Sequence, residues 1–310
     1  MRSHSLGGQR LPSLGIVLVL VGAAAVVAIS SPPAGAGGTE VKLQRSGPLR
    51  YVTLSDRQGP GALELQVECP VGTRLASGGG ALGKVGNAAH FSGFVPRDTG
   101  DLDGDGDDGF ILRGSRNGLI GDTSIKLVAI CLGPGQDSLA YAEQGDVVSE
   151  GTLSAANAHS CPTGSRLTGL GFESDGPSSQ VKIVGLAADL QGGAIDPFEM
   201  VWQYRKSGAS QAVTSHVICL APGFAPLRYA IARRTFPNES TRVLKAHCPG
   251  KSRAIGGGVG SAPTNVLASL PFDDRDRNKV PDDGWLAKVF NYFDPPAEYV
   301  QAFCLGRRTP

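Results

Sequence analysis

The chain has 310 residues, with 29 lysines and arginines against 28 aspartates and glutamates, so its formal net charge is only +1. This balance argues against a nucleic-acid-binding protein, which needs an excess or a stripe of basic residues. The 44 glycines and 21 prolines argue against long helices and predict short strands joined by many turns.

Residues 1–36 have the three parts of a secretory signal peptide. A basic start, an apolar run and a small-residue cleavage site follow one another: Arg2 and Arg10, Leu14 to Ile29, and Ala34-Gly35-Ala36. The sequence therefore predicts a secreted, extracellular protein. The alternative is an uncleaved N-terminal membrane anchor, but the apolar run is shorter than the roughly 18 residues that span a bilayer.

After a polar leader that we expect to be flexible, residues 37–48, the chain contains one pattern three times. Each copy opens with a leucine and a tyrosine, continues with a Cys-Pro turn and a glycine run, and ends on a second cysteine in an apolar segment. Several landmarks kept in step indicate a repeat architecture. The predicted repeats are residues 49–138, 139–226 and 227–310. The turns are Cys69-Pro70-Val71-Gly72-Thr73-Arg74, Cys161-Pro162-Thr163-Gly164-Ser165-Arg166 and Cys248-Pro249-Gly250-Lys251-Ser252-Arg253.

Six cysteines in an exported chain predict disulfide bonds, because the compartment outside the cytosol is oxidising. Six cysteines allow 15 pairings, and threefold repetition reduces them to two schemes. The bonds lie inside each repeat, as Cys69–Cys131, Cys161–Cys219 and Cys248–Cys304, or they join neighbours, as Cys131–Cys161, Cys219–Cys248 and Cys69–Cys304. We prefer the first scheme, because a bond closing a loop of about 60 residues adds roughly 3–4 kcal/mol to a small unit with a thin core.

The local patterns within the repeats are those of β-strands. Residues 63–68 alternate between apolar and polar side chains, as a half-buried strand does, and residues 125–130 resemble a strand that is buried nearly throughout. Residues 181–184 and 285–290 are further predicted strands. The glycine runs predict tight turns and bulges where strands crowd, in preference to a phosphate-binding loop. The predicted fold class is all-β.

An acidic loop in the first repeat, residues 98–109, alternates aspartates with glycines, so that several carboxylates can converge on one hard cation such as calcium. The third repeat keeps the spacing when residues 94–110 are aligned without gaps on residues 269–285. The second repeat has only Asp189 and Asp196 there, so no site is expected. The alternative for both loops is a solvated acidic turn. The candidate calcium ligands are Asp98, Asp101, Asp103, Asp107 and Asp108, and Asp273, Asp276, Asn278, Asp282 and Asp283.

Two other residue types recur among the repeats. An aromatic residue at the end of the acidic loops predicts either a sugar-stacking surface or core packing, and its large area favours the core: Phe110, Trp285 and, in the second repeat, Trp202. An arginine after each Cys-Pro turn predicts a structural salt bridge or carbonyl clamp in preference to an anion site: Arg74, Arg166 and Arg253. No G-x-S-x-G or H-E-x-x-H signature of a catalytic site occurs.

The Cys-Pro turns, the glycine runs, Gly284-Trp285, Asn291 and Cys304-Leu305 together resemble an uncharacterised repeat that is common in exported bacterial proteins. More distantly, the three units look like those of the vitelline membrane outer layer proteins, although that family's own signature after the cysteines is missing here. This second resemblance implies a threefold β-prism. The predicted architecture is three pseudo-equivalent, disulfide-braced repeats, arranged around one threefold axis in a β-prism-like fold or as tandem small β-sandwiches.

Two classes of function follow from these observations. The first is a secreted, non-enzymatic binding or structural protein of the cell exterior, ordered by calcium and directed to cell-surface carbohydrate. The second is a secreted hydrolase with its site between repeats. An enzyme predicts a cleft with a shifted pKa in one repeat, whereas a binding protein predicts exposed aromatic residues at equivalent positions. No nucleic-acid partner is expected, and a membrane is expected only through an uncleaved N-terminal segment.

Overall fold

The structure, a computed structural model, describes residues 39–83, 89–98, 107–116, 123–133, 138–148, 155–175, 181–191, 194–206, 210–237, 239–260, 264–276, 278–291 and 298–306. These residues form 19 β-strands and no helix, which confirms the predicted all-β class. The same residues accordingly include no helix with the length and apolar character needed to cross a membrane. The predicted signal peptide, residues 1–36, lies outside the described part of the chain.

An N-terminal strand, β1 (Glu40–Ser46), precedes three groups of six strands, which we call the first, second and third groups. The first group comprises β2 (Leu49–Gln58), β3 (Gly61–Glu68), β4 (Arg74–Leu82), β5 (Ala89–Arg97), β6 (Gly109–Arg116) and β7 (Thr123–Leu132). The second comprises β8 (Leu139–Val148), β9 (Ala155–Ser160), β10 (Arg166–Ser174), β11 (Val181–Gln191), β12 (Ala194–Lys206) and β13 (Gln211–Leu220). The third comprises β14 (Leu227–Arg234), β15 (Thr241–His247), β16 (Arg253–Gly260), β17 (Thr264–Phe272), β18 (Gly284–Asn291) and β19 (Glu298–Leu305).

The six strands of each group pair in the same antiparallel order. In the first group β7 lies between β2 and β4, and β6 lies between β3 and β5. In the second group β13 lies between β8 and β10, and β12 between β9 and β11. In the third group β19 lies between β14 and β16, and β18 between β15 and β17. Every group thus forms two half-sheets of three strands each.

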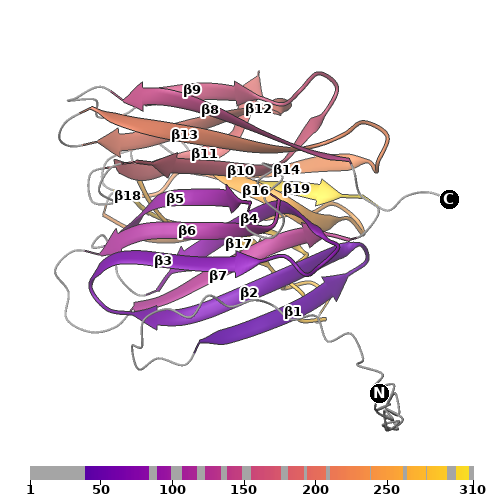
Figure 1. Ribbon diagram of the computed structural model, residues 1–310, viewed down its shortest axis with the longest axis horizontal. Helices are drawn as coiled ribbons and strands as arrows, with labels where there is room; N and C mark the ends of the chain where they lie inside the picture. Colours follow the sequence, from indigo (N-terminus) through magenta and orange to yellow (C-terminus); the bar gives the residue numbers. More distant parts are fainter. Residues whose placement is uncertain are drawn as a thin grey trace, which may run out of the picture.

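The half-sheets combine into three sheets, each of which is shared by two groups. Their strand orders are β1-β2-β7-β4-β17-β18-β15, β3-β6-β5-β10-β13-β8 and β14-β19-β16-β11-β12-β9. At each junction the third strand of one group pairs with the fourth strand of another, as β5 and β10 do in the middle of Figure 1. The three groups therefore close a ring, as in a β-prism. The alternative of tandem sandwiches is wrong, because no group completes a sheet alone.

A single main hydrophobic core joins the three groups, and its buried residues run in sequence from Leu49 to Leu305. The third strands β4, β10 and β16 contact one another pairwise. Each of these strands has a bulge at the same place, just before Ser77, Gly169 and Gly256. A Cβ atom on Gly256 would collide with the carbonyl oxygen of Thr168, so glycine permits this close approach. The glycine runs therefore lie in bulged, crowded strands, as predicted.

The recurring tyrosines join neighbouring groups. Each hydroxyl donates a hydrogen bond to the carbonyl oxygen of the residue that follows the recurring arginine of another group. The three bonds are Tyr141 to Leu75 at 2.6 Å, Tyr229 to Leu167 at 3.1 Å and Tyr51 to Ala254 at 2.6 Å. The bond from Tyr51 connects the first group to the third, although the chain does not link these two groups directly. The ring is therefore closed by the same contact that joins its consecutive members.

The disulfides are Cys69–Cys131, Cys161–Cys219 and Cys248–Cys304, so the predicted scheme inside each repeat is confirmed. In each pair the first cysteine directly follows the second strand of its group, and the other cysteine lies in the sixth strand. These two strands belong to different sheets. Each disulfide therefore ties two of the three sheets together.

The residues after each first cysteine form the predicted turn. The amide of Thr73 donates a hydrogen bond to the carbonyl of Pro70 at 3.0 Å, and Gly72 between them has a φ of 74°. The second group repeats this geometry, with Gly164 at a φ of 84°. In the third group the glycine stands one position earlier, and Gly250 has a φ of 59°. Positive φ is the conformation that glycine adopts without strain, which explains its presence in all three turns.

The prediction of a flexible leader over residues 37–48 is wrong for residues 40–46, which form β1. This strand pairs with β2 from Glu40 opposite Ser55 to Ser46 opposite Leu49. Val41 and Leu43 pack against the core, and the pairing satisfies the outer edge of β2. Figure 1 shows β1 at the end of its sheet, outside β2. Alternation within this short polar segment was the signal that could have revealed it.

Candidate metal centre

The two acidic loops lie at equivalent places, between the fourth and fifth strands of their groups. The first connects β5 to β6, and the second connects β17 to β18. The amide of Asp108 donates to the carbonyl of Arg97 at 2.9 Å, and the amide of Asp283 donates to that of Phe272 at 3.0 Å. These bonds close the base of each loop, so both loops return to the sheet in the same way.

The Asp-Asp-Gly sequence that ends both loops has a structural role in the backbone. The carbonyl of Asp107 accepts from the amide of Leu75, and that of Asp108 accepts from the amide of Cys69, both at 2.7 Å. In the third group Asp282 and Asp283 hold the amides of Ala254 and Cys248 in the same way, at 2.8 and 2.9 Å. The backbone of this sequence thus anchors the cysteine turn in the same way in both repeats.

The first aspartate of each pair also binds the recurring arginine. Arg74 Nε donates to Asp107 Oδ2, and Arg253 Nε lies 3.6 Å from Asp282 Oδ2. Ser46 Oγ, at the end of β1, donates to the same Asp282 oxygen. The prediction of a structural salt bridge is therefore confirmed for these two arginines. Both carboxylates are buried against protein partners, and neither belongs to the cluster described below, so their assignment as calcium ligands stays a prediction.

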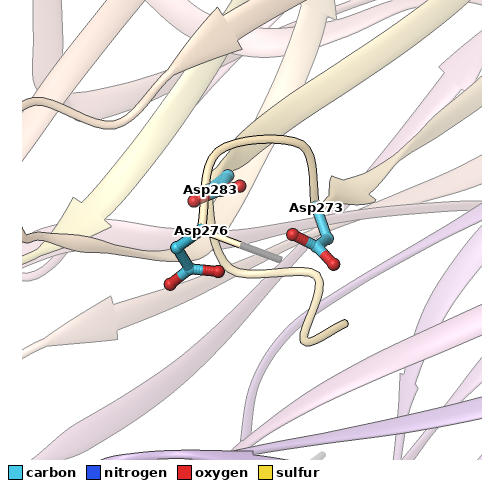
Figure 2. A group of neighbouring side chains, drawn as sticks. All are labelled: Asp273, Asp276 and Asp283. Carbon is cyan, nitrogen blue, oxygen red and sulfur yellow. The ribbon is translucent and has the colours of Figure 1, made fainter. Parts of the chain in front are cut away.

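Three of the predicted ligands in the third group come together: Asp273, Asp276 and Asp283. One carboxylate oxygen of each lies within 4.8 Å of the others. Figure 2 shows the three side chains on one loop, with Asp273 directly after β17 and Asp283 directly before β18. Asp273 Oδ1 is buried and has no hydrogen-bond partner among the described residues. A group of carboxylates with an unsatisfied oxygen is the arrangement that a hard divalent cation would complete.

Electrostatics at the loop favour a cation. Burial raises the pKa of Asp273, and the neighbouring carboxylates of Asp283 and Asp276 raise it further. Burial is also the main cause of a raised pKa at Asp282, while the hydrogen bond from Ser46 opposes this rise. A divalent cation among these carboxylates would reverse the repulsion, because it favours their ionised forms.

Local hydrogen bonds hold the loop in shape. The second oxygen of Asp283 accepts from the amides of Asp274, at 2.7 Å, and Arg275. Asp276 accepts from the amide and the side-chain nitrogen of Asn278, at 3.1 and 2.8 Å. The side-chain oxygen of Asn278 accepts from the amide of Val280, so this predicted ligand also supports the turn.

The other loops differ from this one in what the structure describes. In the first group, Asp101 and Asp103 lie outside the described residues, while Asp98 directly follows β5 and Asp108 directly precedes β6. In the second group β11 and β12 form a hairpin in which Gln191 pairs with Ala194. Asp189 and Asp196 consequently lie in strands, and the acidic loop has no counterpart there.

The aromatic residues after the loops belong to the core. Phe110 and Trp285 are both 0% exposed, and Trp285 Nε1 donates to Ser269 Oγ at 2.9 Å. The sugar-stacking interpretation is therefore wrong for these two residues, and core packing is confirmed. Strand register places Met200, and not Trp202, at the equivalent position of the second group, because Met200 pairs with His159 and Ala188. The side chain of Trp202 lies outside the described residues.

Two serine–histidine pairs bear on the hydrolase hypothesis. Ser115 Oγ lies 3.0 Å from His90 Nε2, and Ser215 Oγ lies 3.2 Å from His159 Nδ1. All four side chains are buried, so neither pair is placed to meet a substrate. Burial lowers the pKa of His159. Burial, and to a lesser extent the neighbouring His159, lowers the pKa of His216 to about 4. The imidazole of His216 is consequently neutral in mildly acidic and neutral solution.

Sequence reasoning missed one ionisable residue, Glu298, at the start of β19. Its side chain is 0% exposed, and neither carboxylate oxygen has a hydrogen-bond partner among the described residues. Burial raises its pKa to about 7. Ile125 and Val213 stand at the same distance before the closing cysteines of the other groups. A glutamate at a position where the other two repeats have an apolar residue was the signal that could have identified it.

Comparisons with known proteins leave the family open: no protein-family model matches the chain, and no curated protein matches it. The resemblances to an exported bacterial repeat and to the vitelline membrane outer layer proteins therefore stay predictions.

Proposed function

We propose that the protein is a secreted, non-enzymatic binding or structural protein of the cell exterior, in which calcium orders the loop between β17 and β18. The observation that carries this proposal is the convergence of Asp273, Asp276 and Asp283, whose oxygens lie within 4.8 Å of one another. Three disulfides that tie the sheets together support a location outside the cytosol, where such bonds persist.

Calcium suits the loop better than a transition metal does. The converging side chains offer only carboxylate oxygens, which are the ligands of hard cations, and neither histidine nor cysteine belongs to the cluster. Calcium also accepts flexible geometry and supplementary carbonyl or water ligands, which an exposed loop can provide. Because the loop receives bonds from Gln44 and Ser46 of β1, a bound ion would strengthen the contact between β1 and the third group.

A non-enzymatic role is supported by the burial of both serine–histidine pairs. The carbohydrate hypothesis loses the support it had in Phe110 and Trp285, because both side chains lie inside the core. The large hydrophobic residues that are exposed in the described part of the chain are three valines, Val71, Val147 and Val243, and none is aromatic. We therefore propose a binding or structural role without assigning carbohydrate as the ligand.

The test is the melting temperature of the full mature chain during a calcium titration. A ligand that binds only the native state at 100 times its dissociation constant stabilises that state by about 2.7 kcal/mol. We expect the melting temperature to rise with calcium for the natural protein, and the rise to be lost in Asp276→Asn, which removes an exposed carboxylate of the cluster. The matched control is Asp274→Asn in the same loop, because Asp274 pairs with Lys245 at 2.8 Å and lies outside the cluster.

A melting temperature that calcium leaves unchanged would remove the metal from the proposal. An equal calcium response in Asp276→Asn and in the natural protein would place the ion elsewhere in the molecule.

A further inference from the structure

The recurring arginines do not all have the same surroundings. Arg74 and Arg253 are partly buried, and each is paired with an aspartate, Asp107 or Asp282. Arg166 of the second group is exposed and forms no ion pair among the described residues. At this position the first and third groups carry an arginine whose charge is neutralised by an aspartate. The second group carries an arginine with no ion pair among the described residues.

Strand register explains why Arg166 differs. Gly109, Gly284 and Glu199 are equivalent, because each pairs with the residue directly before the first cysteine of its group. Two positions earlier the first and third groups have Asp107 and Asp282, whereas the second group has Pro197. Proline offers no acceptor in its side chain, so the partner of the arginine has been removed from this group.

A pocket of about 480 Å³ lies beside Arg166, where the second group joins the third. Its wall is formed by Gly164, Arg166 and the connecting segment 220–227, which includes Pro222, Phe224 and Pro226. This volume is within the range of sites for small molecules, and such sites typically combine apolar walls with a few polar groups. Arg166 is the charged side chain of the lining.

The pKa of Tyr229, which lies where the second and third groups meet, depends on the charges around it. Burial raises the pKa of its hydroxyl, whereas the positive charge of Arg166 opposes that rise and the negative charge of Asp196 adds to it. Asp196 is the acidic residue of the described chain that acts on this hydroxyl. Arg166 is exposed and has no ion pair among the described residues, so its fork of donors can serve the pocket.

We propose that this pocket binds a small organic anion, with a carboxylate or phosphate held by the guanidinium of Arg166 and an apolar body resting on Pro222, Phe224 and Pro226. The planar fork of arginine matches both anions through paired hydrogen bonds. The site is separate from the acidic loop, so its existence does not depend on calcium binding. The expectation that all three arginines are structural is accordingly replaced for Arg166.

The experiment is a titration of the full mature chain with benzoate and with phenyl phosphate, followed by backbone amide NMR. Benzamide serves as the uncharged counterpart of benzoate. We expect the amides of Gly164, Ala221 and Gly223 to shift, with half-saturation at about 1 mM. In Arg166→Gln the affinity for both anions falls at least about tenfold, because the charge-assisted bonds are lost. The control is Arg242→Gln, which removes an exposed arginine of β15 and leaves binding unchanged.

A second variant, Pro197→Asp, returns an acid to the position that Asp107 and Asp282 have in the other groups. We expect the new carboxylate to pair with Arg166 and to lower the affinity for both anions. The melting temperature should equal or exceed that of the natural protein. The ratio of the two anion affinities identifies the preferred group, carboxylate or phosphate. Equal affinity in Arg166→Gln, binding of benzamide as tight as that of benzoate, or no shift at the pocket amides would each overturn the proposal.

Discussion

At the scale of single residues, Glu298 shows how one substitution changes a position of the core. The equivalent residues Ile125 and Val213 are 2% and 1% exposed, and the carboxyl of Glu298 is 0% exposed. Burial is the sole cause of its raised pKa, about 7, so no charged group compensates the ionised form. The neutral acid is therefore the form that suits the folded protein.

This residue makes stability depend on pH. The folded pKa of about 7 exceeds the ordinary value of 4.5, so its contribution is fully present below pH 4.5 and is lost as the pH rises through 7. The loss amounts to about 3 kcal/mol, at 1.36 kcal/mol for each pKa unit. Glu298→Gln removes the titration, so we expect its unfolding free energy to match the natural protein near pH 4.5 and to exceed it at pH 8.

Denaturant unfolding at several pH values between 4.5 and 8 measures this difference. Glu143→Gln is the control, because the side chain of Glu143 is 75% exposed. A difference between Glu298→Gln and the natural protein that stays constant over this pH range would show that Glu298 does not titrate as described.

At the scale of elements, the turn after the first cysteine is held by the acidic loop of the same group in the first and third groups. In the first group, Asp107 contributes its carbonyl to Leu75 and its carboxylate to Arg74. Because the carboxylate is 7% exposed, its removal leaves part of the guanidinium without a buried acceptor. In the second group the equivalent position is Pro197, and the turn forms with the same hydrogen bond, from the amide of Ser165 to the carbonyl of Pro162.

We expect Asp107→Ala to lower the unfolding free energy by about 2 kcal/mol, which is the usual effect of leaving a buried polar partner unsatisfied. A double-mutant cycle with Arg74→Met should show a coupling energy of about 1 kcal/mol or more, because the two residues are in direct contact. Arg166→Met is the control, and we expect a change below about 0.5 kcal/mol because Arg166 is exposed and unpaired. Additive effects of Asp107→Ala and Arg74→Met would contradict the bridge.

Element by element, the sequence predicted what depends on local pattern and failed where distant segments meet. Period-two alternation placed residues 63–68 in β3, and the apolar run of residues 125–130 lies in β7. The same reasoning treated residues 37–48 as a leader, because what makes β1 a strand is the open edge of β2. The sequence predicted a salt bridge for Arg74. It did not identify Asp107 as the partner, because the alternating aspartates suggested calcium ligands instead.

Three-dimensional proximity also decided the metal cluster. Ligand spacing in the sequence suggested ten candidate residues, and among the described carboxylate, histidine and cysteine side chains the loop brings together Asp273, Asp276 and Asp283. Pairing with the recurring arginines keeps Asp107 and Asp282 at the same place in both loops, as calcium coordination would, so sequence repetition could not separate the two causes.

At the scale of the whole molecule, no group contains all the partners of its own strands. In the second group, β10 pairs with β5 of the first group and β11 pairs with β16 of the third. Gly169 packs against the carbonyl oxygen of Ala76, 2.6 Å from where its Cβ would be, so even the innermost strand relies on a neighbour. Folding of the three groups is therefore a joint event, since each removes surface of the other two from water.

We expect a fragment of residues 139–226 to remain unfolded even with the Cys161–Cys219 bond formed, whereas the full mature chain unfolds in one cooperative transition. Amide proton dispersion in the NMR spectrum of the fragment, beside that of the full chain, measures this. Native-like dispersion and a cooperative melt of the fragment alone would show that one group is a self-sufficient domain.

The hydroxyl of Tyr51, bound to Ala254, has a consequence for how the polypeptide can be threaded. The junction between the third and first groups has the same kinds of contact as the other two junctions but no covalent connection. The ring therefore does not require the chain to be interrupted at this junction and not at another. A circular permutant opened at residues 134–137, with its original ends bridged by a linker, would retain every strand pair of the three sheets.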